Sequence, residues 1–106
     1  MRRSTDFASV VKGGVRARGG PLIVHQRPGI SSMPPLVGFV VAKSVGGSVE
    51  RHRVVRRLRA QVADRLHLLP AGSGTVVRAL PAARDASFHE LGAGLDHALA
   101  RLAERR

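Results

Sequence analysis

The stretch KSVGGSVERHRVVRRLRA, residues 43–60, joins a strand pattern to a helix pattern and carries the densest charge in the chain. Gly46 and Gly47 interrupt a strand-like run, and Ser48 can cap a new helix. The first turns of this helix carry His52 and five arginines: Arg51, Arg53, Arg56, Arg57 and Arg59. Because the free N–H groups and the dipole of a helix start also favour anions, this arrangement predicts a phosphate-binding site.

The apolar residues after Ser48 recur at three- and four-residue intervals, which predicts a helix from Ser48 to about Leu69 with one buried stripe. The stripe would consist of Val55, Leu58, Val62, Leu66 and Leu69. A helical projection turns Arg53, Arg56 and Arg57 away from the stripe and places His52 and Arg59 beside it. Arg51 falls on the stripe side but in the first turn, where it can project beyond the packed region.

Three apolar segments predict strands: residues 21–26, 36–43 and 74–80. A helix capped by Ser4 or Thr5 should precede them, with Phe7, Val10 and Val11 on one face. Ser87 and Glu90 form a capping box that opens a last helix. The expected fold is an α+β two-layer sandwich, in which helices pack on a small sheet in the order α-β-β-α-β-α.

The composition indicates one domain, residues 1–106, with 43% hydrophobic residues and no cysteine. No segment approaches the length of a transmembrane helix, so a cytoplasmic protein without a membrane partner is expected. The formal net charge of +11 favours a polyanionic partner, most often nucleic acid. Aromatic residues make up only 3% of the chain, which argues against a sheet that stacks several bases.

The remaining polar residues do not suggest a metal site or a catalytic site. The five histidines lack ligand spacing, and the seven acidic residues are scattered singly. We therefore expect no metal ligand, no cofactor bound by the protein alone and no catalytic side chain. A run of charge is usually a solvated helix face, but the arginine cluster has only Glu50 as a nearby acid. Its arginines would repel one another without an anion, which favours an RNA or DNA backbone as partner.

The segment LVGFVVAKSVGGSVERHRVVRRLRA, residues 36–60, resembles the signature of the bacterial ribonuclease P protein subunit. That family typically has a strand ending in Ser-Lys-Lys, a Val-Gly turn, an Arg-Asn-Arg box, a Lys-Arg pair and a further arginine. Residues 2–14, RRSTDFASVVKGG, are similar to the opening helix of the family. The resemblance spans nearly the whole chain in order.

The resemblance implies an RNA-binding protein that assists a catalytic RNA in removing the 5′ leader from precursor tRNA. The RNA subunit, with bound magnesium, would hydrolyse the phosphodiester bond. Its partners would be the catalytic RNA and the leader of precursor tRNA, and no protein partner is predicted. The implied sheet has four strands and an uncommon left-handed β-α-β crossover. The fourth strand would come from residues 14–21 or 27–35.

By position, the resemblance assigns RNA binding to the arginine box: Arg51, His52, Arg53, Arg56, Arg57 and Arg59. It assigns the leader-binding cleft to Phe7, His25 and Lys43. His52 replaces the asparagine of the box and Val55 replaces a lysine, with Arg57 available to supply that charge. Phe7 could equally be a core residue.

Two other functions fit part of the sequence. A ribosome-associated or other structural RNA-binding module would share the charge and fold class, but the box does not single it out. A basic amphipathic helix on an anionic membrane is less favoured, because the apolar stripe suits packing on a sheet and no Trp or Phe lies in the central helix.

Overall fold

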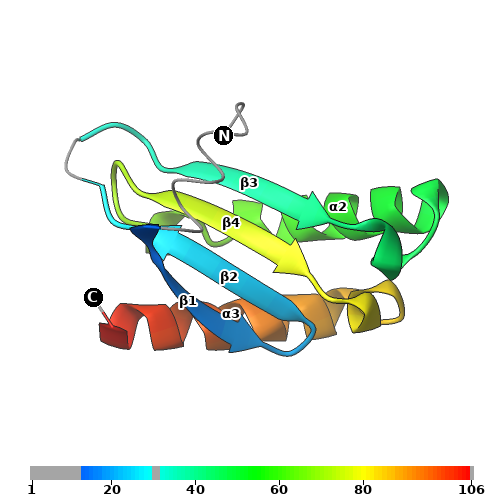
Figure 1. Cartoon of the computed structure of the whole chain (residues 1–106). Helices are drawn as coiled ribbons and strands as arrows, with labels where there is room; N and C mark the ends of the chain where they lie inside the picture. The colour runs from blue at the N-terminus through cyan, green and yellow to red at the C-terminus, as the bar shows by residue number, and fades with distance from the viewer. Residues whose placement is uncertain (1–12, 30–31, 106) are drawn as a thin grey trace.

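The computed structural model describes residues 13–29 and 32–105, which form a two-layer α+β sandwich. Four strands make one sheet in the order β1-β2-β4-β3: β1 (Val15–Gly19), β2 (Leu22–Arg27), β4 (Gly74–Ala79) and β3 (Leu36–Val41). Two long helices, α2 (Ser48–Ala63) and α3 (Phe88–Arg105), cover the same face of the sheet (Figure 1). Short 3₁₀ turns η1 (Lys43–Val45), η2 (Leu66–Leu68) and η3 (Pro81–Arg84) join these elements. The expected N-terminal helix, with Phe7, lies outside the described residues.

The fourth strand is β1, in the first of the two regions that the sequence allowed. Residues 15–20 read as a basic connection, but Val15–Gly19 pairs antiparallel with β2, from Val15 opposite Gln26 to Gly19 opposite Leu22. Gly20 has a φ of 54°, which lets the chain turn within two residues. The tight turn makes the hairpin, and Ala17 and Gly19 then face the helices.

The parallel pair β3 and β4 is connected through α2, which runs back beneath the sheet. In Figure 1, α2 lies behind the sheet, β3 lies above β4, and both strands run to the right. A chain that passes from β3 through α2 to β4 in this arrangement makes a left-handed crossover. About 98% of such connections are right-handed. The uncommon hand that the family resemblance implied is therefore present.

The core lies between the sheet and the helices and is built mostly of Leu and Val. On α3, the four leucines Leu91, Leu95, Leu99 and Leu102 are buried, but Phe88 is 40% exposed at the first residue of the helix. The predicted capping box is present: the Glu90 N–H donates to Ser87 Oγ (3.0 Å), and the Ser87 N–H donates to Glu90 Oε1 (2.8 Å).

Helix α2 differs from its predicted extent and orientation. It ends at Ala63 rather than near Leu69, and its buried residues are Val54, Leu58, Gln61 and Val62. Val55 is only half-buried, and Leu66 lies in η2 with 46% of its surface exposed. The predicted stripe is therefore wrong at these two positions. The physical reason is that α2 packs mainly on α3 rather than on β3, which rotates its buried face by about one residue.

Bonds to α3 fix that rotation. The Gln61 side-chain amide donates to the carbonyl of Phe88 at 2.8 Å. Arg65 forms a two-pronged contact with Asp96, with its Nε 2.6 Å from Oδ1 and its Nη2 3.1 Å from Oδ2. This hydrogen bonding raises the pKa of Arg65 and lowers the pKa of Asp96. None of the described helices is long and apolar enough to cross a membrane.

Candidate nucleic-acid interface

The link between β3 and α2 places the arginine box at one end of the sandwich. After β3, the chain makes the η1 turn and passes Gly46 before α2 begins at Ser48. Gly47, not Ser48, occupies the N-cap position, and it makes no side-chain capping bond. The predicted cap is therefore wrong by one residue. Because Ser48 is already helical, its side chain is left beside the arginines.

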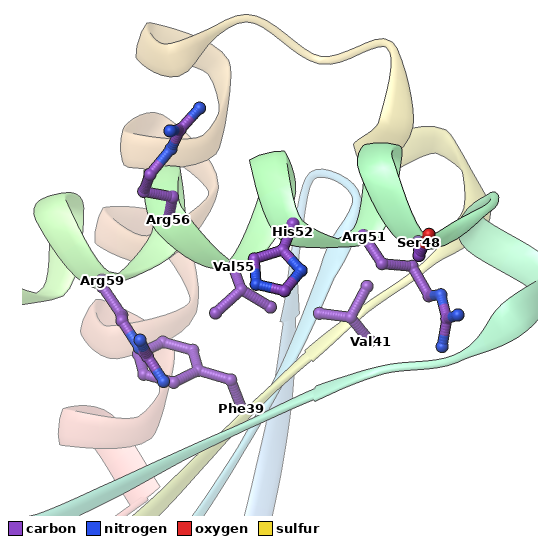
Figure 2. A pocket seen from close by; sticks show the side chains of 8 residues that line it. All are labelled: Phe39, Val41, Ser48, Arg51, His52, Val55, Arg56 and Arg59. Carbon is purple, nitrogen blue, oxygen red and sulfur yellow. The ribbon is translucent and has the colours of Figure 1, made fainter.

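A groove about 590 Å³ in volume runs between β3 and α2. We call it the arginine groove; its lining is Phe39, Val41, Ser48, Arg51, His52, Val55, Arg56 and Arg59. Figure 2 shows Phe39 and Val41 rising from the strand toward the helix, with Val55 above them. None of the lining residues is acidic. The groove thus combines an apolar floor with a cationic rim.

Arg59 and Phe39 meet at one end of the arginine groove. The Arg59 guanidinium carbon lies 6.0 Å from the centroid of the Phe39 ring, within the range of a cation–π contact. Arg59 is exposed, whereas Phe39 is half-buried against the core. This pairing was not apparent from the sequence, because the almost unbroken apolar run of residues 36–43 is typical of a strand that is buried on both faces. An aromatic residue on a strand beside a cationic helix is the signal that could have revealed it.

The structure divides the predicted arginine box into two sets. Arg51, His52, Arg56 and Arg59 line the arginine groove. Arg53 and Arg57 lie toward η3, where Arg53 Nη2 is 3.5 Å from the carbonyl oxygen of Arg84 and Arg57 Nη1 donates to that of Ala86 at 3.2 Å. Arg53 and Arg57 are half-buried, and their guanidinium groups already contact backbone carbonyl oxygens. Only the first set forms a shared, open cationic surface.

The residues predicted for a leader cleft do not form one site in the described part of the chain. His25, on β2, is 4% exposed and lies beside Val76 of β4, which in turn pairs with Gly38 of β3. Lys43 is exposed in η1, two strands away from His25 and beyond the end of β3. Phe7, the third member, is outside the described residues.

A second group of arginines surrounds His25 on the sheet. Side chains alternate along a strand, and Leu22, Val24 and Gln26 face the helices, so His25 faces the other side. Arg16 is its partner on β1, and Arg18 and Arg78 flank Ile23 in the next row. Burial lowers the pKa of His25, and the positive charges of Arg16 and Arg78 lower it further. Sequence reasoning missed Arg16 and Arg18 because β1 read as a loop, and it missed Arg78 because the pairing of the strands was not predicted.

Within residues 13–29 and 32–105, no three His, Cys, Asp or Glu side chains come together as metal ligands. Glu50, the acid of the first turn of α2, lies 3.9 Å from the Arg84 guanidinium. The arrangement therefore suits binding of a polyanion.

Comparisons over nearly the whole sequence match this chain to one family of known proteins. The sequence model of the family described as Ribonuclease P matches residues 1–103. The "Ribonuclease P protein component" of Streptomyces bikiniensis is 51% identical over 110 residues, which cover 96% of this chain and 89% of that one. The protein of the same name from Acidothermus cellulolyticus is 47% identical and covers 100% of this chain and 89% of its own.

Solved structures share the fold. The RNase P protein of Staphylococcus aureus matches with a TM-score of 0.83 at 21% identity, covering 98% of this chain and 94% of that chain. The RNase P protein of Thermotoga maritima matches with a TM-score of 0.80 at 20% identity, with coverages of 98% and 94%.

Proposed function

The chain belongs to the ribonuclease P protein family, and we infer from that membership what its surfaces do. It is the protein component of an endoribonuclease that works with an RNA subunit in removing the 5′ leader of precursor tRNA. The observation that carries this conclusion is a match over almost the whole chain, at up to 51% identity, to proteins of that one name. A cytoplasmic location is part of the proposal.

The arginine groove is the surface that we assign to the RNA subunit. Arg51, Arg56 and Arg59 present planar guanidinium groups, which fit phosphate oxygens in pairs. His52 supplies a further ring N–H in place of the amide of the family box. No carboxylate of the lining competes for these donors. The apolar face of α2 is meanwhile committed to the core.

Arg53 and Arg57 have a supporting role in this proposal. Their bonds to the carbonyls of Arg84 and Ala86 tie α2 to the η3 region. This contact holds the start of α2 at a fixed angle, so the opposite face of the helix presents the arginine groove to RNA. Of the six predicted RNA-binding positions, four thus contact RNA, and the other two hold those four in place.

The leader of precursor tRNA is assigned to the other face of the sheet. Arg16, Arg18 and Arg78 give that face three exposed cations, beside the buried ring of His25. Phe7 and Lys43 stay candidate members of this site, with Lys43 exposed in η1. Phosphodiester hydrolysis belongs to the RNA subunit, and we place the magnesium there, not on this chain.

Reconstitution tests the proposed function. The purified chain is added to the catalytic RNA of the same organism with a precursor tRNA, at low magnesium. Cleavage at the 5′ end of the mature tRNA should accelerate, because the arginines offset repulsion between the two RNAs. The chain alone should leave the precursor intact. Absence of acceleration, with a chain that is shown to be folded, would contradict the proposal.

A further inference from the structure

We propose that the arginine groove holds an unpaired nucleobase, stacked on Phe39, while the arginines at its rim hold the neighbouring phosphates. This inference rests on the proposed function, because it takes RNA as the partner. It adds the stacking of a nucleobase to the phosphate contacts that we assign to the groove. The base could belong to the catalytic RNA or to the precursor tRNA, and the experiment below separates these sources.

The floor of the groove is the first argument. Phe39, Val41 and Val55 are half-buried and together give the groove an apolar surface. A phosphate gains nothing from such a surface, whereas the flat face of a base is well suited to it. Val55 adds apolar surface at the centre of the groove (Figure 2).

The second argument is the spacing between Phe39 and Arg59. Direct stacking would place two flat groups at roughly 3.5–4 Å, the optimal separation of carbon atoms. A base held between them would need about twice that distance. The observed 6.0 Å from the Arg59 guanidinium carbon to the ring centroid lies between the two. Because Arg59 is exposed, a rotation of its side chain opens a slot that both groups can line.

The cationic rim of the groove also favours a nucleotide as ligand. Arg51, His52 and Arg56 line the groove along α2. In Figure 2, His52 and Arg51 follow one another on the Val41 side of Phe39, where the nucleotide next to a base on Phe39 would meet them, whereas Arg56 points away from the floor. Arg51 Nε is buried and has no hydrogen-bond partner among the described residues, so a ligand acceptor that reached it would satisfy this donor. The lining contains no acid. The rim therefore complements the backbone of a nucleotide as the floor complements its base.

The volume and shape of the groove favour an unpaired base over a duplex. A volume of about 590 Å³ is within the range of sites that enclose small organic ligands, roughly 300–1,000 Å³. In an A-form duplex the faces of the bases are covered by their neighbours, so only the edges can be read. Stacking on Phe39 needs a free face, which loops, bulges and single strands provide.

The test compares three variants with wild type in binding to the catalytic RNA of the same organism, with and without precursor tRNA. Phe39→Leu keeps an apolar side chain against the core but removes the ring. Phe39→Tyr keeps the ring. Phe88→Leu removes an exposed aromatic residue that does not line the groove and serves as control. Thermal unfolding of each variant shows whether a change in affinity follows from lost structure.

Phe39→Leu should weaken binding about tenfold, while Phe39→Tyr and Phe88→Leu bind like wild type. The slope of log affinity against log salt should stay the same in Phe39→Leu, because a stacked base releases no counterions. Loss of affinity for the catalytic RNA alone assigns the base to that RNA. Loss that occurs only when precursor is present assigns it to the tRNA.

The inference is overturned if Phe39→Leu binds like wild type in both arms, or if Phe39→Tyr loses as much affinity as Phe39→Leu. In either case, wild-type protein that binds and accelerates cleavage leaves the proposed function standing. Wild-type protein that does neither removes the proposed function, and the stacking site with it.

Discussion

Arg56 and Arg57 are neighbours in the sequence, but successive helical residues point about 100° apart. Arg56 is exposed in the arginine groove, whereas Arg57 donates to the Ala86 carbonyl. Arg57→Ala should therefore lower the free energy of unfolding by about 1–2 kcal/mol, since a buried carbonyl loses its donor. Urea unfolding measures this loss.

Arg56→Ala is the matched control. It should change the free energy of unfolding by less than about 0.5 kcal/mol. It should weaken RNA binding and reduce the salt slope by about one unit, because one phosphate contact is lost. The division of the box would be wrong if the two substitutions had the same effect on both stability and salt slope.

His25 gives the protein a specific dependence on pH. Its pKa in the folded chain is below the ordinary value of 6.5, because burial and the charges of Arg16 and Arg78 disfavour the imidazolium. Between 6.5 and the lower folded value, the unfolded chain binds a proton that the folded chain does not. Stability therefore falls as the pH falls through this window and levels off below it.

His25→Phe keeps a ring at this position and removes the titration. Its free energy of unfolding should decline less than that of wild type when the pH falls from 7.5 through 6.5 toward acid. Chemical unfolding at a series of pH values measures the difference between the two curves. Parallel curves would show that His25 does not carry this dependence.

The roles of single residues were only partly predictable. The sequence showed which residues form the cluster. Four of the six predicted positions, three arginines and His52, line one groove. It could not show which of them turn toward η3, because a rotation of α2 by one residue changes the answer. That rotation depends on Gln61 and Arg65 bonding to α3, more than 25 residues away in the sequence.

At the scale of elements, close packing of β1 on α3 explains Gly94 in the last helix. Gly94 approaches Gly19 so closely that a Cβ at Gly94 would lie 2.6 Å from the Gly19 carbonyl oxygen. Gly94→Ala should therefore destabilise the protein by about 1–3 kcal/mol, although alanine favours helix by roughly 1 kcal/mol. Thermal or urea unfolding measures the net effect.

The neighbouring exposed residue provides the comparison. Ala93→Gly changes no packing contact in the core and should cost only the intrinsic helix preference, about 1 kcal/mol. If Gly94→Ala instead stabilised the protein, the approach of β1 to α3 would be looser than the structure shows.

The elements themselves were predictable where local signals were strong. Apolar periodicity and turn residues correctly located β2, β3, β4, the start of α2 and the capping box of α3. β1 was not, because a segment such as Val-Arg-Ala-Arg-Gly becomes a strand only when β2 lies beside it. The end of α2 was also misplaced, since Leu66 and Leu69 continue the helical spacing although the chain leaves the helix at Asp64.

At the scale of the whole molecule, the net charge of +11 predicted a polyanion but not how the cations are distributed. Among the described residues, two surfaces each gather several cations: the arginine groove at the β3 edge and the sheet face that carries Arg16, Arg18 and Arg78. Which face a strand residue takes depends on register, and register depends on pairing across the sheet. The handedness of the crossover likewise came from the family resemblance, since periodicity carries no information about it.

The position of β4 beside β2 has a consequence for the protein during its synthesis. Gln26 and Thr75 face each other across the sheet but are 49 residues apart in the chain. At translation rates of about 5–20 residues per second, β2 waits roughly 2–10 seconds for its partner. The carbonyls of Arg84 and Ala86, which orient α2, are made later still. The arginine-rich segment therefore leaves the ribosome before the contacts that orient α2 can form. Specific RNA binding is acquired late and cooperatively, when these contacts and the pairing of β2 with β4 are made.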